Sequence, residues 1–314
     1  MNVVQFTKQH DEQIWISGYK ESLSGKSEGT IDAYLRIVKQ FVRWVTDKPG
    51  GEDGFNPILF TRTAVEEYFK NQISNASISH KQRVKTVLND FANWLMEQDA
   101  IKKNPVRVIE IPAQSLLAPR ILTPDQRYIL KNLVERQGDQ RSAALFALGY
   151  WAGCRVSDVS HLMMNNVRVG PKIGDIIVGF KGNKTRDIPL LNEVRRPLYE
   201  YIHDERQKSK HAHSPYVFPS QRGDRLTEYG IHHWFRAMKK MATNSEWPLI
   251  EDITYHDLRH DFAHRAREAG WPIEYVAVYL GHIKKKGTPA IETTARYTQP
   301  SREAIKEKLL DLKG

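Results

Sequence analysis

Histidine and arginine gather in one short stretch of this sequence, ITYHDLRHDFAH, over residues 253–264. His256 and His260 are four residues apart, which places both on one face of a helix. His256 and Arg259 are three residues apart and share a face in the same way. Such a group can bind a metal ion, bind a phosphate, or serve only as part of an ordinary helix.

A zinc site is the weakest of these three interpretations. Zinc proteases carry an HExxH motif, whereas here Asp257 follows the first histidine. Arg259 would place a fixed positive charge beside the cation. The chain has a single cysteine, Cys154, so it offers no cysteine pair for a structural zinc site. We therefore expect no metal here.

Phosphate recognition explains more features of the sequence than a metal site does. Arginine presents a planar fork of donors that matches phosphate oxygens, and histidine donates or moves a proton near neutral pH. Negative charge that develops on a reacting phosphoryl group is stabilised by several converging donors. The reaction also needs a nucleophile. Further candidates are Arg155 in GCRVSD, Lys181 in GFKGNK, His282 in YLGH and Tyr297 in TTARYTQ. Taken alone, each of these residues also fits an ordinary structural role: capping a helix, packing in the core or lying on the solvated surface.

In this order, the candidates resemble the signature of tyrosine site-specific recombinases and integrases, of the simple Xer-like or transposon-resolvase type. The resemblance spans residues 155–300 and rests on GCRVSDV, FKGNKTRDIPL, YHDLRHDFAHRAREAG, VAVYLGH and TTARYT. It implies an enzyme that breaks and rejoins DNA strands, as in the integration, excision or resolution of mobile or circular DNA. It also implies that no metal or other cofactor is needed.

The same resemblance implies a role for each residue at the phosphate. Tyr297 would attack a DNA phosphodiester and form a 3′-phosphotyrosyl intermediate. Arg155 and Arg259 would hold the non-bridging oxygens, and His282 would hydrogen-bond the phosphate.

Proton transfer falls to two further residues. Lys181 would protonate the leaving 5′-oxygen, with Lys184 as a rival for that role, and His256 would accept the proton of Tyr297. His260 and Asp158 are expected to support this group without touching the phosphate.

The segment between His282 and Tyr297, residues 283–296, is longer than is usual in the family. We expect a longer loop there that contacts the DNA backbone, with a solvated insertion as the alternative. The DNA-binding candidates outside the catalytic six are Lys81, Arg83, Lys85, Lys184, Lys284, Lys285 and Lys286.

Hydrophobic periodicity predicts the elements that must position these residues. Helical patterns fill residues 1–105, which we assign to a core-type DNA-binding domain. A proline-rich stretch predicts a linker at 106–121. Residues 122–314 then form a catalytic domain with a C-terminal interaction tail, and two apolar runs within 175–190 flank Gly-Asn and predict a hairpin. The expected fold is mainly α, an all-helical domain plus a mixed α+β domain with a small antiparallel sheet.

Charge and composition agree with a nucleic-acid partner. The net charge is +10, and because acidic and basic residues nearly balance over 1–118, almost all of the excess lies in 119–314. We expect double-stranded DNA with inverted-repeat core sites and a homo-oligomer that is a tetramer in the synaptic complex. No apolar run approaches the length of a membrane span, so a cytoplasmic location is expected.

Two other functions fit parts of this pattern. A type IB topoisomerase uses the same phosphotyrosine chemistry but relaxes supercoils on any DNA. A sequence-specific DNA-binding protein without catalysis would need neither the tyrosine nor the arginines, and all of these are present.

Overall fold

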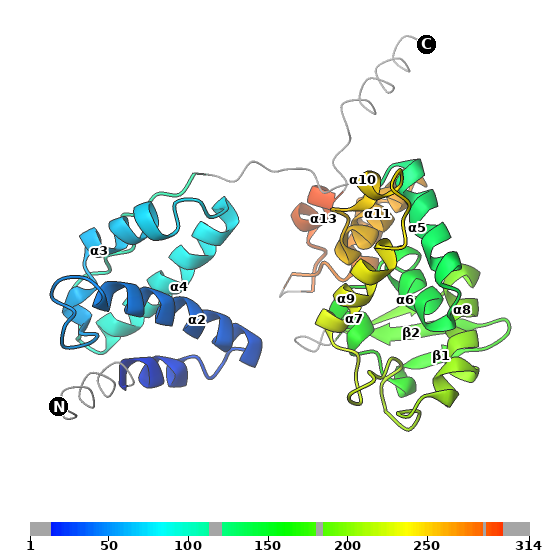
Figure 1. Cartoon of the computed structure of the whole chain (residues 1–314), viewed down its shortest axis with the longest axis horizontal. Helices are drawn as coiled ribbons and strands as arrows, with labels where there is room; N and C mark the ends of the chain where they lie inside the picture. The colour runs from blue at the N-terminus through cyan, green and yellow to red at the C-terminus, as the bar shows by residue number, and fades with distance from the viewer. Residues whose placement is uncertain (1–13, 113–120, 180–184, 285–286, 298–314) are drawn as a thin grey trace, which may run out of the picture. The chain divides into compact units, whose positions relative to one another are not determined.

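The computed structural model describes residues 14–112, 121–179, 185–284 and 287–297 (Figure 1). The chain divides into two compact units, Met1–Ser115 and Leu116–Gly314. The division falls inside the stretch 106–121 that the prolines predicted as a linker. Within the described residues, no helix combines the length and apolar character that crossing a bilayer requires.

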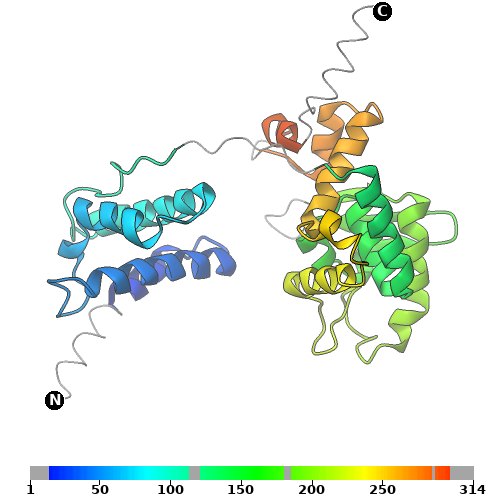
Figure 2. The same ribbon diagram turned by 45° about the horizontal axis from the view of Figure 1, so that its top comes forward.

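The described part of the first unit contains helices and connecting loops but no strand. Residues 14–22 form a helix before α2, and α2 and α4 pack side by side (Figures 1 and 2). Phe41 of α2 and Phe91 of α4 are fully buried in the shared core, as expected from the helical spacing of their apolar neighbours. The named elements are α2 (Glu28–Thr46), η1 (Pro57–Leu59), α3 (Arg62–Glu67), the π-helical turn η2 (Tyr68–Gln72) and α4 (Ile78–Glu97).

The second unit combines helices with one small sheet. Thr123 caps the first described helix of this unit together with Gln126 in a reciprocal capping box. The elements, in chain order, are α5 (Pro124–Gln137), α6 (Gln140–Tyr150), α7 (Val156–Ser160), η3 (Met164–Asn166), β1 (Val167–Val169), β2 (Gly174–Val178), β3 (Arg186–Pro189), α8 (Asn192–His203), η4 (Glu205–Lys208), α9 (Glu228–Lys239), α10 (Trp247–Ile250), α11 (Tyr255–Glu268), α12 (Ile273–Leu280) and α13 (Ile291–Tyr297).

The sheet has three antiparallel strands in the order β1-β2-β3. Ile176 pairs with Ile188, and both side chains are fully buried. This confirms the predicted pairing of the two apolar runs, while Gly182 and Asn183, where the turn was predicted, lie outside the described part. The strand β1 was not predicted, because Val167–Val169 is too short to show an alternating pattern. The mainly helical fold with a small antiparallel sheet is confirmed.

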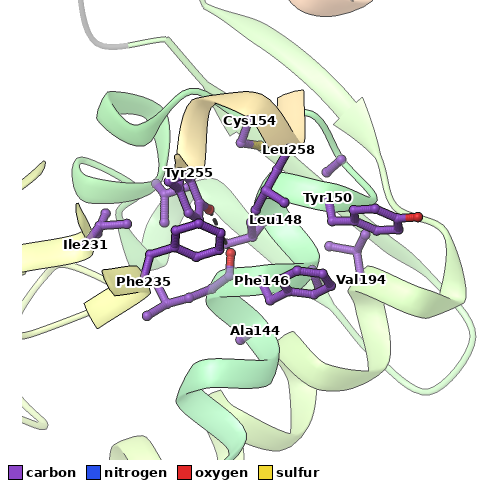
Figure 3. Packing of buried hydrophobic residues seen from close by; sticks show 14 of the residues in the cluster. Ala144, Phe146, Leu148, Tyr150, Cys154, Val194, Ile231, Phe235, Tyr255 and Leu258 are labelled. Carbon is purple, nitrogen blue, oxygen red and sulfur yellow. Dashed lines mark hydrogen bonds between the residues drawn. The ribbon is translucent and has the colours of Figure 1, made fainter. Parts of the chain in front are cut away.

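The helix α11 packs tightly against α6 in the core of the second unit. A Cβ on Gly149 would lie 2.8 Å from the ring of Tyr255, so only glycine allows this approach. The Tyr255 hydroxyl donates to the Leu145 carbonyl at 2.7 Å. Figure 3 shows Tyr255 beside Phe235, with ring centroids 5.8 Å apart at an angle of 86°. These contacts fix the helix that carries the HDLRH motif.

Candidate active site

His256 and Arg259 lie in the first two turns of α11. Asp257 caps this helix, because its Oδ2 accepts from the Thr254 backbone N–H at 2.7 Å. Asp257 is thus occupied with capping, where a zinc protease would have its catalytic glutamate. His256 is exposed, whereas Arg259 is only 1% exposed.

Several acceptors hold the guanidinium of Arg259 in place. Its Nη1 donates to the Gly153 carbonyl at 2.6 Å, and its Nη2 donates to the Leu280 carbonyl at 2.5 Å. The same Nη2 lies 3.1 Å from Nε2 of His282. The plane of this donor fork is therefore set by the folded chain.

Arg155 precedes α7 at its N-cap position. Its backbone N–H donates to Oδ2 of Asp158 at 3.0 Å, and its Nη2 donates to the Gly281 carbonyl at 3.4 Å. Asp158 is buried and forms an ion pair with Arg186, the first residue of β3, at 2.7 Å. Asp158 therefore connects Arg155 to the sheet, and its supporting role stays a prediction.

The turn that follows α12 connects both arginines to His282. Leu280 accepts from Arg259 and Gly281 accepts from Arg155, through consecutive backbone carbonyls. Gly281 is left-handed, with φ of +67°, and a Cβ there would lie 3.0 Å from Nη1 of Arg186. The LGH motif thus needs its glycine both for the turn and for the space that the arginines occupy.

His282 is buried in this turn, at 6% exposure. Burial, followed by the charges of Arg259, Arg155 and Arg186, lowers its pKa to about 3. The imidazole is therefore neutral at pH 7. Its Nδ1 lies 3.0 Å from Oγ1 of Thr294 on α13, so His282 bridges Arg259 and α13.

Two histidines of α11, His256 and His260, also have lowered pKa values and are neutral at pH 7. Loss of hydration is the largest cause that lowers the pKa of His256, and the charge of Arg259 adds to it. The same loss of hydration lowers the pKa of His260 to about 4, with His256 as the next cause. The two rings meet edge to face, with centroids 4.4 Å apart. A neutral His256 can accept a proton.

The segment after His282 closes as a turn. Ile283 and Pro289 pair as an antiparallel bridge, and the Ala290 N–H donates to the His282 carbonyl at 2.6 Å. The chain therefore returns beside His282 before α13 begins. The backbone of Tyr297 ends α13, while its side chain lies outside the described part.

Lys181 lies in 180–184, and its position is outside the described residues, as is that of Lys184. The described flank of this loop is Arg186, whose ion pair with Asp158 attaches β3 to α7. Three predicted residues, Arg155, Arg259 and His282, are therefore joined by contacts.

Sequence reasoning missed three residues of this site: Gly281, Arg186 and Thr294. Gly281 had a usable signal, because a glycine directly after an apolar helix commonly takes the left-handed conformation. Arg186 and Thr294 had none, since each acquires its partner only when distant elements pack together.

The other DNA-binding candidates are spread over two regions. On α4, Arg83 is exposed, Lys85 is half-buried, and Nζ of Lys81 donates to the Ser74 carbonyl at 2.6 Å. Lys284 is exposed and lies 3.6 Å from a carboxylate oxygen of Glu292. Lys285 and Lys286 fall outside the described residues. Their contact with DNA stays a prediction.

One group of three metal-ligand side chains occurs among the described residues, and it lies outside the six catalytic candidates. His211, His213 and Asp224 place one ligand atom each within 4.8 Å of one another. Nδ1 of His211 and Oδ1 of Asp224 are 3.9 Å apart. Ligand atoms on a tetrahedral zinc are about 3.3 Å apart, so these side chains would have to rotate before they could bind an ion.

Known proteins resemble the chain over most of its length. The tyrosine recombinase XerC of Bacillus pumilus is 27% identical, covering 88% of this chain and 88% of its own. The TnP I resolvase of Bacillus thuringiensis is 26% identical, covering 90% and 94%. Among solved structures, a lambda integrase tetramer bound to a Holliday junction has a similar fold, with a TM-score of 0.66 and 16% identity over 92% of this chain and 79% of that one.

The family assignment rests on the second unit, where the arginine, histidine and tyrosine motifs occur. The model of the phage integrase family matches residues 120–303, which is more than half of the chain. The chain therefore belongs to the phage integrase family, the tyrosine recombinases, as its motifs predicted.

Proposed function

We propose that this protein is a site-specific DNA recombinase that cuts and rejoins strands through a 3′-phosphotyrosyl intermediate at Tyr297. One observation carries the proposal: Arg155, which precedes α7, and Arg259 of α11 contact consecutive carbonyls of the turn that holds His282. That turn also contacts α13, which ends at Tyr297. Arginines gathered around a turn that bears a histidine suit a phosphate with negative charge on several oxygens.

The chemistry is an exchange of phosphoester bonds. Oη of Tyr297 forms a bond to phosphorus while the bond from phosphorus to the 5′-oxygen breaks. The tyrosine proton passes to His256, and Lys181 supplies a proton to the departing 5′-oxygen. Because the phosphotyrosine conserves the ester bond, a 5′-hydroxyl of another strand can reverse the step without a nucleotide cofactor.

The electrostatics support these assignments. The lowered pKa of His256 keeps the imidazole unprotonated and ready to accept a proton at pH 7. Arg155 and Arg259 remain charged at any physiological pH. Guanidinium groups can thus stabilise the transition state where other phosphoryl-transfer enzymes use metal ions.

Two protomers on inverted half-sites, paired into a tetramer, form the assembly that we propose. The lambda integrase of similar fold assembles as a tetramer on a Holliday junction. The basic excess of residues 119–314 favours a polyanionic partner. Action on DNA and the single buried cysteine agree with the cytoplasmic location expected from the sequence.

A covalent adduct tests the proposal. The full chain would be incubated with a nicked duplex that carries an inverted repeat taken from the DNA flanking its gene. Denaturing electrophoresis should show a protein–DNA adduct for the wild type and none for Tyr297→Phe, which keeps the ring but lacks the nucleophile. No adduct with the wild type would contradict the enzyme, and relaxation of supercoiled DNA lacking the repeat would favour a topoisomerase.

A further inference from the structure

A buried chain of hydrogen bonds runs from Arg259 through His282 to α13. His282 Nε2 lies 3.1 Å from Nη2 of Arg259, and His282 Nδ1 lies 3.0 Å from Oγ1 of Thr294. Oγ1 of Thr294 donates onward to the Ala290 carbonyl at 3.2 Å. Arg259, His282 and Thr294 are 1%, 6% and 0% exposed, so water does not compete for these groups.

The proton positions in this chain follow from the donor inventory. A guanidinium has only N–H donors, so Nε2 of His282 must accept from Arg259. A neutral imidazole carries one proton, which then lies on Nδ1. That N–H needs an acceptor, and Oγ1 of Thr294 provides it because the Thr294 hydroxyl proton points to Ala290.

The short helix α13 depends on such anchors. It spans only Ile291–Tyr297, and a helix of this length is not stable in water without tertiary contacts. Thr294 lies three residues before Tyr297 in the backbone of this helix, a rise of about 4.5 Å along the axis. Whatever fixes Thr294 therefore also fixes the rotation and height of the helix at Tyr297.

We propose that Thr294 is a positioning residue for the nucleophile: its hydroxyl holds His282 in the Nδ1–H form and locks α13 to the turn that binds Arg155 and Arg259. This inference rests on the proposed function of Tyr297. In the free protein His282 acts as a bridge between the arginine group and the nucleophile helix. Its Nε2 accepts from Arg259 there, and donation from Nε2 to a phosphate would require the other tautomer.

Two neighbouring threonines make a matched pair of variants. Thr294→Val keeps the shape of the side chain and removes the hydroxyl, whereas Thr294→Ser keeps the hydroxyl. Thr293→Val makes the same change at the adjacent exposed position. We expect Thr294→Val to slow adduct formation in single-turnover reactions at saturating protein by about 10- to 100-fold, as a small misplacement of a reacting group does. Thr294→Ser and Thr293→Val should stay within about 3-fold of the wild type, and the Kd for the nicked duplex should be unchanged in all three.

A second measurement needs no DNA and no activity. Long-range ¹⁵N–¹H spectra of the histidine-labelled full chain report the tautomer of each histidine, and a His282→Asn variant identifies the signal of His282. The wild type should show the Nδ1–H form, and Thr294→Val should lose it, while Thr293→Val should keep it. This signature would not change if Thr294 only filled space.

The outcomes separate the two proposals. An Nε2–H form in the wild type, or Thr294→Val that forms adduct as fast as Thr293→Val, would overturn the positioning role. A wild type that shows the Nδ1–H form but never forms an adduct would overturn the proposed function, and the role of Thr294 in cleavage with it, while leaving the hydrogen bond established.

Discussion

At the scale of single residues, Arg259 is oriented before any substrate binds. The carbonyls of Gly153 and Leu280 fix two sides of its guanidinium, and His282 accepts from it as well. Donors that are already in place need no reorganisation when charge develops on a phosphate, and this preorganisation is a large part of enzymatic electrostatic stabilisation. Lysine could not replace Arg259, because a single ammonium group cannot span these acceptors.

Three histidines with lowered pKa values make the stability of the free protein sensitive to acid. The pKa values of His256, His260 and His282 all lie below the usual value of 6.5. Just below pH 6.5 the unfolded chain therefore binds more protons than the folded chain, so the free energy of unfolding falls as the pH falls. His282 alone should contribute a slope of up to about 1.4 kcal/mol per pH unit.

Urea unfolding of the free protein at pH 7.5, 6 and 5 measures this slope. His282→Asn keeps a polar group at the position of Nδ1 but does not titrate, so the stability of this variant should fall less steeply with acid. His213→Asn, at an exposed histidine, serves as the control and should follow the wild type. Equal slopes for the two variants would contradict the lowered pKa of His282.

At the scale of elements, the ion pair between Arg186 and Asp158 joins β3 to α7. The two side chains are 10% and 4% exposed, and the contact is 2.7 Å. Since Arg155 precedes α7 and the loop bearing Lys181 precedes β3, this pair connects the elements that carry two proposed catalytic groups. It therefore matters for the site as well as for stability.

Arg186→Met should both destabilise the protein and slow cleavage. Loss of the guanidinium leaves the buried carboxylate of Asp158 without its ion pair, which typically costs about 3–5 kcal/mol. Arg168→Met on β1 is a suitable comparison, because Arg168 is 71% exposed and solvent screens its pair with Asp175, which therefore adds little to stability. Chemical unfolding and adduct formation would be measured for both variants, and similar losses in the two would show that the Arg186 pair has no special role.

The elements also show which parts of the site a sequence can reveal. The order of motifs predicted Arg155, Arg259 and His282, and the contacts join these three. Thr293 and Thr294 are the same residue type at neighbouring positions, yet one is exposed and the other is fully buried beside His282. Which of them faces inward depends on how α13 is rotated against the turn that holds His282. Local sequence does not determine that rotation.

At the scale of the whole molecule, the two units have separate hydrophobic cores. Phe41 and Phe91 belong to one core, while Leu145 and Tyr255 belong to the other. The prolines that interrupt helical periodicity predicted a linker at 106–121, and the division between the units falls inside that stretch. The strand β1, in contrast, becomes apparent only through its pairing with β2. Charge is also divided: the basic excess lies in 119–314.

The predicted contact of Lys284, Lys285 and Lys286 with the DNA backbone can be tested through the salt dependence of binding. Each phosphate contact that is lost should lower the slope of log K against log salt by about 0.9. If the loop contacts the DNA backbone, replacing Lys284, Lys285 and Lys286 with alanine should lower the slope by about 1–3.

A control variant that replaces the exposed Lys172, Lys208 and Lys240 removes the same total charge from other parts of the surface. Binding would be measured between about 50 and 200 mM salt. If the loop lysines contact the DNA backbone, the slope should change more for the loop variant than for the control. Equal changes in slope would mean that the loop lysines act only through net charge and do not touch the backbone.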